Sequence, residues 1–179
     1  KPYLEVNNYP VLAYSLRFFE DFRFCDEVVI IAAEGELEYC RRNIVEKYNF
    51  AKVAAVLPGG RERQDSIWVG LKFLQNRNCS LVAVHDSARP LLSLTLMEEL
   101  INEAIKWNAA IPGVRVKDTI KLVDKNNFVL STPDRKALYA VQTPQVFNYQ
   151  QLYNAYVRAE QDNYKGTDDA MLYEKYIGK

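Results

Sequence analysis

The chain has 179 residues, of which 49% are hydrophobic and 26% charged, as in ordinary folded globular proteins. Its 23 basic residues balance 23 acidic ones, so it lacks the basic surface that binds nucleic acid or anionic lipid. No apolar run reaches membrane-spanning length, and we expect no signal peptide. The length predicts a single domain with a substantial core.

The cysteines and the histidine exclude two further kinds of site. Cys25, Cys40 and Cys79 are far apart, odd in number and in no C-x-x-C pair, and the chain holds one histidine. These residues form no zinc-binding pattern. Dispersed cysteines are typical of reduced thiols, so we expect a soluble cytoplasmic protein.

The first half of the chain alternates apolar strand patterns with helical patterns. We expect strands at 28–33, 53–57 and 81–84, and helices at 11–19, 36–48, 67–74 and 96–107. Asp65 or Ser66 is the expected cap of the third helix, and Thr95 with Glu98 forms a capping box for the fourth. Successive strand–helix units predict a parallel, right-handed βαβ arrangement, with strand 81–84 buried on both faces.

The second half predicts shorter strands and a hairpin. We expect a strand at 109–116 broken by Pro112-Gly113, a hairpin of 119–123 and 128–131, a short strand at 138–141, and helices at 149–161 and 170–176. The hairpin interrupts the sheet as an arm. Because an isolated hairpin is marginally stable, we expect the arm to contact a partner chain.

The stretch His85-Asp86-Ser87-Ala88-Arg89-Pro90 follows the third predicted strand. Ligands of open α/β sheets bind beyond the carboxyl ends of the strands. A carboxylate there can hold a divalent cation, and an arginine close behind it can bind phosphate. The alternative is an aspartate that caps the next helix and an arginine in a surface ion pair.

The segment Pro58-Gly59-Gly60-Arg61-Glu62-Arg63-Gln64-Asp65-Ser66 leads from a strand into a helix. Paired glycines let the backbone approach a ligand, and a helix start offers free N–H groups to an anion or a base edge. It is neither a Walker loop nor a dinucleotide fingerprint. A tight turn followed by an ordinary N-cap is the alternative.

Other polar groups also follow predicted strands or precede predicted helices. They are Asp118-Thr119, Asp134-Arg135, Gln142-Thr143-Pro144-Gln145 and Gly166-Thr167-Asp168-Asp169. Each is also typical of a turn or a helix cap. With one histidine the chain offers no Ser-His-Asp triad, and His85 is interpreted as structural rather than as a general base. The residues alone indicate an anion-binding α/β domain.

Taken together and in order, these segments resemble the 2-C-methyl-D-erythritol 4-phosphate cytidylyltransferase family. The resemblance runs from the first residue to the last, and the H-D-x-A-R-P and Q-T-P-Q-x-F blocks are specific as a set. It implies a three-layer Rossmann-like nucleotidyltransferase fold with a mostly parallel sheet and a protruding β-hairpin arm. It also implies one cytidylyltransferase domain over 1–179, with the arm at about 117–133.

The resemblance further implies an enzyme that uses Mg²⁺ to transfer a cytidylyl group from CTP to the polyol phosphate, releasing pyrophosphate. By this resemblance the catalytic residues are Lys1 and Arg135, and Asp86 is the residue associated with the metal. The residues that match nucleotide-binding positions are Gly59, Gly60, Ser66, Asp86 and Ala88. Those that match acceptor-binding positions are Arg89, Thr119, Arg135, Thr143 and Thr167. In the family the arm crosses to a second subunit, so a homodimer is expected, with Arg135 supplied to the neighbour's site.

The resemblance also has departures. The family's N-terminal strand and Gly-rich loop would precede Lys1, and a segment with another catalytic lysine would follow Lys179. We expect such residues beyond the sequence given, since a chain lacking both should be inactive. Arg61 stands where relatives often carry an acid, which affects one cytosine contact.

Two alternatives remain open. One is a ribitol-5-phosphate cytidylyltransferase, although Ala88 and the run Leu138-Tyr139-Ala140-Val141 favour methylerythritol phosphate. The other is a non-catalytic nucleotide-binding module, which applies if both end segments are truly absent.

Overall fold

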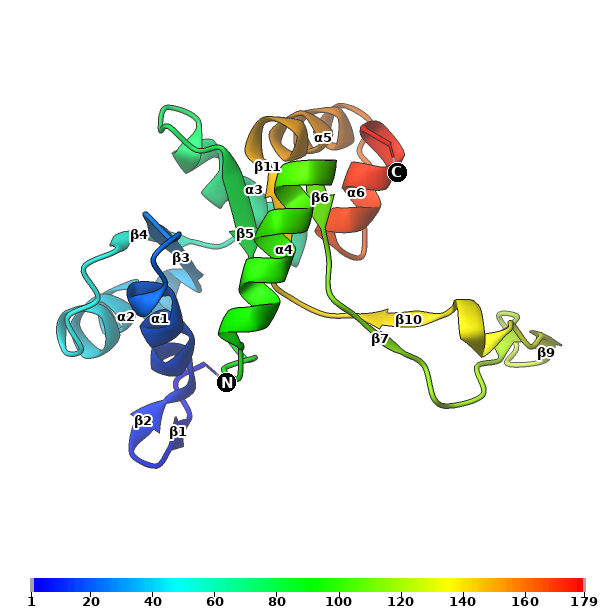
Figure 1. Ribbon diagram of the computed structural model, residues 1–179, viewed down its shortest axis with the longest axis horizontal. Helices are drawn as coiled ribbons and strands as arrows, with labels where there is room; N and C mark the ends of the chain where they lie inside the picture. The colour runs from blue at the N-terminus through cyan, green and yellow to red at the C-terminus, as the bar shows by residue number, and fades with distance from the viewer. Residues whose placement is uncertain (1, 179) are drawn as a thin grey trace.

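The protein is described by a computed structural model covering residues 2–178 (Figure 1); the expected catalytic Lys1 lies outside the described residues. The α-helices are α1 Val11–Asp21, α2 Leu37–Cys40, α3 Arg63–Leu74, α4 Leu94–Trp107, α5 Tyr149–Gln161 and α6 Asp169–Tyr176. Shorter helical turns are η1 Glu34–Glu36, η2 Arg41–Glu46 and η3 Arg135–Ala137. The strands are β1 Glu5–Val6, β2 Tyr9–Pro10, β3 Val28–Ala32, β4 Val53–Pro58, β5 Leu81–Val84, β6 Ala109–Ala110, β7 Gly113–Arg115, β8 Leu122–Val123, β9 Val129–Ser131, β10 Tyr139–Val141 and β11 Gln145–Asn148.

Strands β3 and β4 form the parallel pair that their apolar runs predict. The run of β-branched residues in β3 suits an extended backbone, since branching at Cβ restricts the side chain in a helix. Helices α1 and α2 pack against this pair, and the buried side chains of Leu16, Ile30 and Ile44 belong to the same core cluster. The expected strand–helix pattern is thus confirmed in this part of the chain.

A second sheet has the order β5-β11-β6, with β11 antiparallel to both neighbours. Residues Gln145, Val146 and Phe147 of β11 are buried, because helices cover this central strand. Phe147 packs with α5 and α6, whereas Val146 packs with α4. Figure 1 shows α4 in the middle of the molecule, with α5 and α6 at the top of the view beside the upper part of α4.

The prediction that β5 lies parallel to β3 and β4 in one sheet is wrong. This strand pairs antiparallel with β11, and in the described chain it shares no sheet with β3 or β4. A cavity of about 1020 Å³ lies between β3 and β5, lined largely by apolar residues of both strands and of α1, α3 and α4. Because the cavity exposes one edge of β5, its residues are only partly covered rather than buried on both faces.

The predicted helix starts need two corrections. Helix α3 begins at Arg63, because Glu62 and Asp65 make a reciprocal capping box one turn before the expected cap. Helix α4 is capped by Ser93, whose Oγ accepts a hydrogen bond from Leu96 N at 3.2 Å, rather than by Thr95. The predicted helices at 11–19, 149–161 and 170–176 are confirmed. The one predicted at 36–48 is α-helical only in α2 and continues as the wider turns of η2 to Glu46.

The predicted hairpin is confirmed and is carried on an extended stalk. Strands β7 and β10 pair antiparallel, and beyond them β8 pairs with β9. Figure 1 shows these two ribbons reaching away from the body of the molecule. Both strands of the hairpin are exposed along their length, and Phe128 at its turn is 70% exposed.

Two expectations from composition can be compared with the structure. The three cysteines are free thiols. None of the helices in the described part of the chain has the length and apolar character needed to cross a bilayer.

Candidate active site

The glycine pair at the end of β4 lies directly against the start of α3. The Gly60 N–H donates to Ser66 Oγ at 3.1 Å, and the Ser66 hydroxyl donates to the Glu62 carbonyl at 3.1 Å. A Cβ on Gly60 would lie 2.2 Å from Asp65 Cβ, so a larger residue would force this loop off the helix. Ser66 therefore joins the glycine loop to the first turn of α3.

The turn from Asp86 to Arg89 follows β5. Arg89 N donates to the Asp86 carbonyl at 2.9 Å, which closes the turn, and Ala88 lies exposed within it. The Asp86 N–H donates to Thr143 Oγ1 at 3.0 Å. Thr143 precedes β11, so the antiparallel pairing of β5 and β11 brings together two segments that are distant in sequence.

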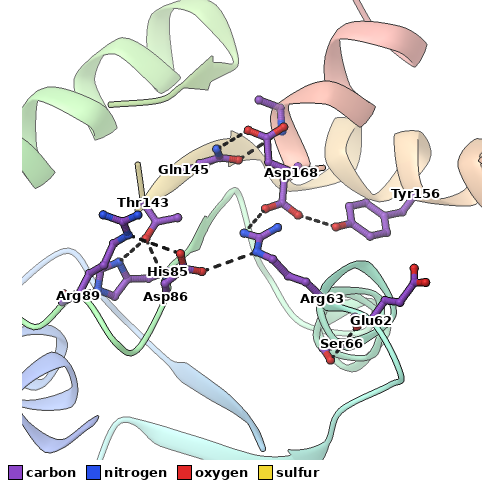
Figure 2. A network of polar contacts seen from close by, with 12 residues as sticks. Glu62, Arg63, Ser66, His85, Asp86, Arg89, Thr143, Gln145, Tyr156 and Asp168 are labelled. Carbon is purple, nitrogen blue, oxygen red and sulfur yellow. Dashed lines mark hydrogen bonds and ion pairs between the residues drawn. The ribbon is translucent and has the colours of Figure 1, made fainter. Parts of the chain in front are cut away.

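The Asp86 carboxylate lies between two guanidinium groups (Figure 2). Arg63 Nε is 3.6 Å from Oδ1, and Arg89 Nε is 3.5 Å from Oδ2. The Asp86 side chain is 43% exposed, so the carboxylate remains accessible to a ligand. This arrangement puts one acid and two bases at the carboxyl end of a strand, where α/β proteins bind ligands.

Arg63 also reaches a buried carboxylate. Its Nη2 donates to Asp169 Oδ2 at 2.7 Å, and the Tyr156 hydroxyl donates to Asp169 Oδ1 at 2.5 Å. Burial alone would lower the pKa of Arg63, but the Asp169 carboxylate outweighs it and raises that pKa. Burial, reinforced by the same carboxylate, raises the pKa of Tyr156. The site thus contains a buried, charge-assisted network that links α3 to α5 and α6.

Gln145 fixes the segment that leads into α6. Its Nε2 donates to Asp168 Oδ2 at 2.8 Å, and its Oε1 accepts from Ala170 N at 3.3 Å. Asp168 Oδ1 caps α6 by accepting from Met171 N at 2.9 Å. Because Gln145 is fully buried in β11, these bonds hold the exposed Thr167 near the end of the strand.

The structure brings some of the expected site residues into direct contact and leaves others apart. Asp86 contacts Arg89 and Thr143. Gly59, Gly60 and Ser66 form one loop with the start of α3, whose Arg63 reaches Asp86. Thr119 and Arg135 are exposed on the arm, where Arg135 Nη1 donates to the Lys117 carbonyl at 2.8 Å.

Sequence reasoning missed three residues of this site. Arg63 and Asp169 lie within two of the segments named above but received no role, Tyr156 lies in none, and Arg63 and Asp169 are 106 positions apart. The one available signal was the acidic pair Asp168-Asp169 at a helix start, where only one carboxylate is needed as the cap. The second, buried acid then requires a partner cation.

The residues at Asp86 fit a divalent cation only as part of a larger complex. In the described part of the chain, no three His, Cys, Asp or Glu side chains gather as a metal-binding group. Mg²⁺ commonly binds one or two carboxylates together with substrate phosphates and water. The single accessible carboxylate of Asp86 suits that mode.

An α/β fold with a glycine loop, a carboxylate and arginines at its strand ends defines the class: a Rossmann-like nucleotidyltransferase. The family model of 2-C-methyl-D-erythritol 4-phosphate cytidylyltransferase (IspD) matches residues 1–179. The chain belongs to this family.

Relatives and solved structures agree with that assignment. The 2-C-methyl-D-erythritol 4-phosphate cytidylyltransferase of Caldanaerobacter subterraneus subsp. tengcongensis is 41% identical over 175 residues, covering 98% of this chain and 77% of the relative. That of Syntrophotalea carbinolica is 42% identical over 179 residues, covering 100% and 76%. The crystal structure of 4-diphosphocytidyl-2C-methyl-D-erythritol synthase from Anaerococcus prevotii superposes with a TM-score of 0.87 at 31% identity, covering 99% of this chain and 78% of that one.

Proposed function

We propose that this protein transfers a cytidylyl group from CTP to 2-C-methyl-D-erythritol 4-phosphate in isoprenoid precursor biosynthesis. The observation that carries the proposal is the family match over residues 1–179. The convergence of the glycine loop, Asp86 and Arg89 at the strand ends supports it. The products are 4-diphosphocytidyl-2-C-methyl-D-erythritol and pyrophosphate.

The reaction is a substitution at phosphorus. A phosphate oxygen of the acceptor attacks the α-phosphorus of CTP, a new phosphoanhydride bond forms, and the bond to the β-phosphate breaks as pyrophosphate leaves. No covalent enzyme intermediate is required. Catalysis of this kind depends on alignment of the two substrates and on stabilising the negative charge of the transition state.

The nucleotide is assigned to the side of the glycine loop. Gly59 and Gly60 let the backbone approach the base, and Ser66 offers a hydroxyl that already bonds within the loop. Ala88, exposed in the turn after β5, lies beside the ribose in this assignment. Because these contacts are made largely by backbone groups and one hydroxyl, they can recognise the edge of the cytosine base without placing a charged side chain beside it.

The acceptor phosphate is assigned to the other side of Asp86. Arg89 supplies a guanidinium, which can bind phosphate through two parallel hydrogen bonds. Thr143 and Thr167 line this site from the two segments that Gln145 and Asp168 hold together. Thr167 supplies the hydroxyl, since that of Thr143 is bonded to Asp86 and His85 within the chain. Thr119 and Arg135 complete this site from the arm of a second copy of the chain in the proposed homodimer.

We propose that the Asp86 carboxylate would help to hold Mg²⁺ when CTP is bound. When bound, the cation would neutralise phosphate charge and align the α-phosphorus. The chain itself contributes Asp86. Its backbone N–H donates to Thr143, and its carboxylate is held in direction by the guanidinium groups of Arg63 and Arg89. We also assign the protein to the cytoplasm, which its three free cysteines favour.

The proposal is tested by pyrophosphate release from CTP and methylerythritol phosphate, with EDTA as the metal control. We expect release that stops with EDTA and falls by about two orders of magnitude or more in Asp86→Asn. Asp162→Asn is the matched control, since that carboxylate accepts from Tyr176 away from this site. Full-length protein that releases no pyrophosphate from these substrates would contradict the proposal.

A further inference from the structure

The single histidine of the chain has no role in the function proposed so far. His85 stands between β5 and Asp86, and its ring meets the ring of Phe19 edge-on at 5.6 Å between centroids. A neutral imidazole has one donor nitrogen and one acceptor nitrogen, so its two neighbours define its form.

Both ring nitrogens have partners in the chain. His85 Nε2 lies 3.1 Å from the Arg89 carbonyl oxygen. His85 Nδ1 lies 3.3 Å from Thr143 Oγ1 (Figure 2). A carbonyl oxygen can only accept, so Nε2 carries a proton, and in the neutral ring Nδ1 accepts from the Thr143 hydroxyl.

The hydroxyl of Thr143 extends this arrangement to Asp86. Its oxygen accepts the Asp86 N–H at 3.0 Å while its proton points to His85 Nδ1. On the other side of the ring, the Arg89 carbonyl belongs to a turn that Arg89 N closes on Asp86 O. One imidazole is therefore bonded, directly or through Thr143, to both ends of the Asp86–Arg89 turn.

We propose that His85 is a positioning residue that fixes the distance between the cation-binding carboxylate of Asp86 and the acceptor-binding guanidinium of Arg89. This inference rests on the roles proposed above for those two side chains. His85 is not assigned as a base, since both ring nitrogens are engaged within the chain. In-line transfer needs the two substrates aligned closely, so a looser turn should weaken binding and slow the chemical step.

Three substitutions of His85 test the contact with the Arg89 carbonyl and the contact with the Thr143 hydroxyl independently. In His85→Gln the side-chain amide nitrogen can replace Nε2, which keeps the bond to the Arg89 carbonyl. In His85→Asn the amide oxygen can replace Nδ1, which keeps the acceptor for Thr143. His85→Phe keeps an aromatic ring beside Phe19 and loses both bonds.

We expect His85→Phe to raise the KM for CTP and for the polyol phosphate, each by about fivefold or more, because each lost bond contributes modestly. His85→Asn should mainly raise the KM for the polyol phosphate, and His85→Gln mainly that for Mg²⁺–CTP. Tyr149→Phe is the matched control, since its hydroxyl donates to the Leu71 carbonyl at 2.9 Å in the core. It should lower the melting temperature without changing either KM.

A spectroscopic readout keeps the test independent of turnover. The ¹⁵N spectrum of the imidazole, assigned by its loss in His85→Asn, should show a proton on Nε2, and Thr143→Val should shift the Nδ1 signal. A ring with no proton on Nε2, or unchanged KM values in folded His85→Phe, would overturn the inference. Full-length wild type that shows the expected spectrum but no turnover would count against the proposed function instead.

Discussion

Arg63 Nη2 donates a 2.7 Å hydrogen bond to Asp169 Oδ2, and the Asp169 side chain has no exposed surface. The Arg63 side chain is 37% exposed and turns its Nε toward Asp86. One guanidinium thus joins a buried structural carboxylate to an accessible functional one. Removing it should affect both stability and ligand binding.

Arg63→Gln should destabilise the protein by about 3 kcal/mol, because among residues 2–178 it leaves the buried Asp169 charge with the Tyr156 hydroxyl as its one remaining side-chain partner. It should also raise the KM for Mg²⁺–CTP, since Asp86 loses one of its flanking cations. Urea unfolding and steady-state kinetics measure the two effects.

Tyr156→Phe is the matched comparison for Arg63→Gln. It removes one hydrogen bond to the same carboxylate and should cost about 2 kcal/mol of stability. The contact between Arg63 and Asp86 is retained, so the KM for Mg²⁺–CTP should not change. Equal KM changes in the two variants would show that lost stability, rather than Arg63, controls binding.

Arg135→Ala should raise the KM for the polyol phosphate by at least tenfold and leave that for CTP nearly unchanged. The reason is the loss of a guanidinium that can bind the acceptor phosphate through two bonds. Arg115→Ala, on the stalk where Arg115 Nη1 donates to the Lys136 carbonyl, is a control for general disturbance of the arm. Equal losses for both substrates would argue against the acceptor role of Arg135.

The exposed hairpin predicts a homodimer. Strands β8 and β9 leave apolar side chains such as Leu122, Phe128 and Leu130 uncovered, and a two-stranded hairpin is weakly stable alone. Sedimentation at micromolar concentration should give a dimer for wild type, and replacing these three residues by serine should shift it toward a monomer. A wild-type monomer under these conditions would refute the proposal.

Local patterns predicted the individual elements well and their long-range pairing less well. The apolar runs at 28–32 and 53–58 and the helical spacing at 149–161 specify structure through neighbours a few residues away. The antiparallel pairing of β5 with β11 depends instead on segments more than 60 positions apart, and no periodicity encodes it. The cap at Glu62 was missed because Asp and Ser are commoner caps than Glu.

The residues of the candidate site also fall into those that local sequence predicts and those that depend on long-range packing. Asp86 and Arg89 could be predicted because an acid and a base directly follow a strand. The network of Arg63, Asp169 and Tyr156 could not, because burial of Asp169 results from the packing of α3, α5 and α6. Roles on the arm, such as that of Arg135, came from family resemblance alone.

The most direct test of the central claim is a competition assay with full-length protein, Mg²⁺ and CTP. Equal concentrations of 2-C-methyl-D-erythritol 4-phosphate and ribitol 5-phosphate are offered together, and both nucleotide products are quantified by mass spectrometry. We predict that 4-diphosphocytidyl-2-C-methyl-D-erythritol forms in large excess with one pyrophosphate per turnover. A predominance of CDP-ribitol, or the formation of neither nucleotide product, would contradict the account.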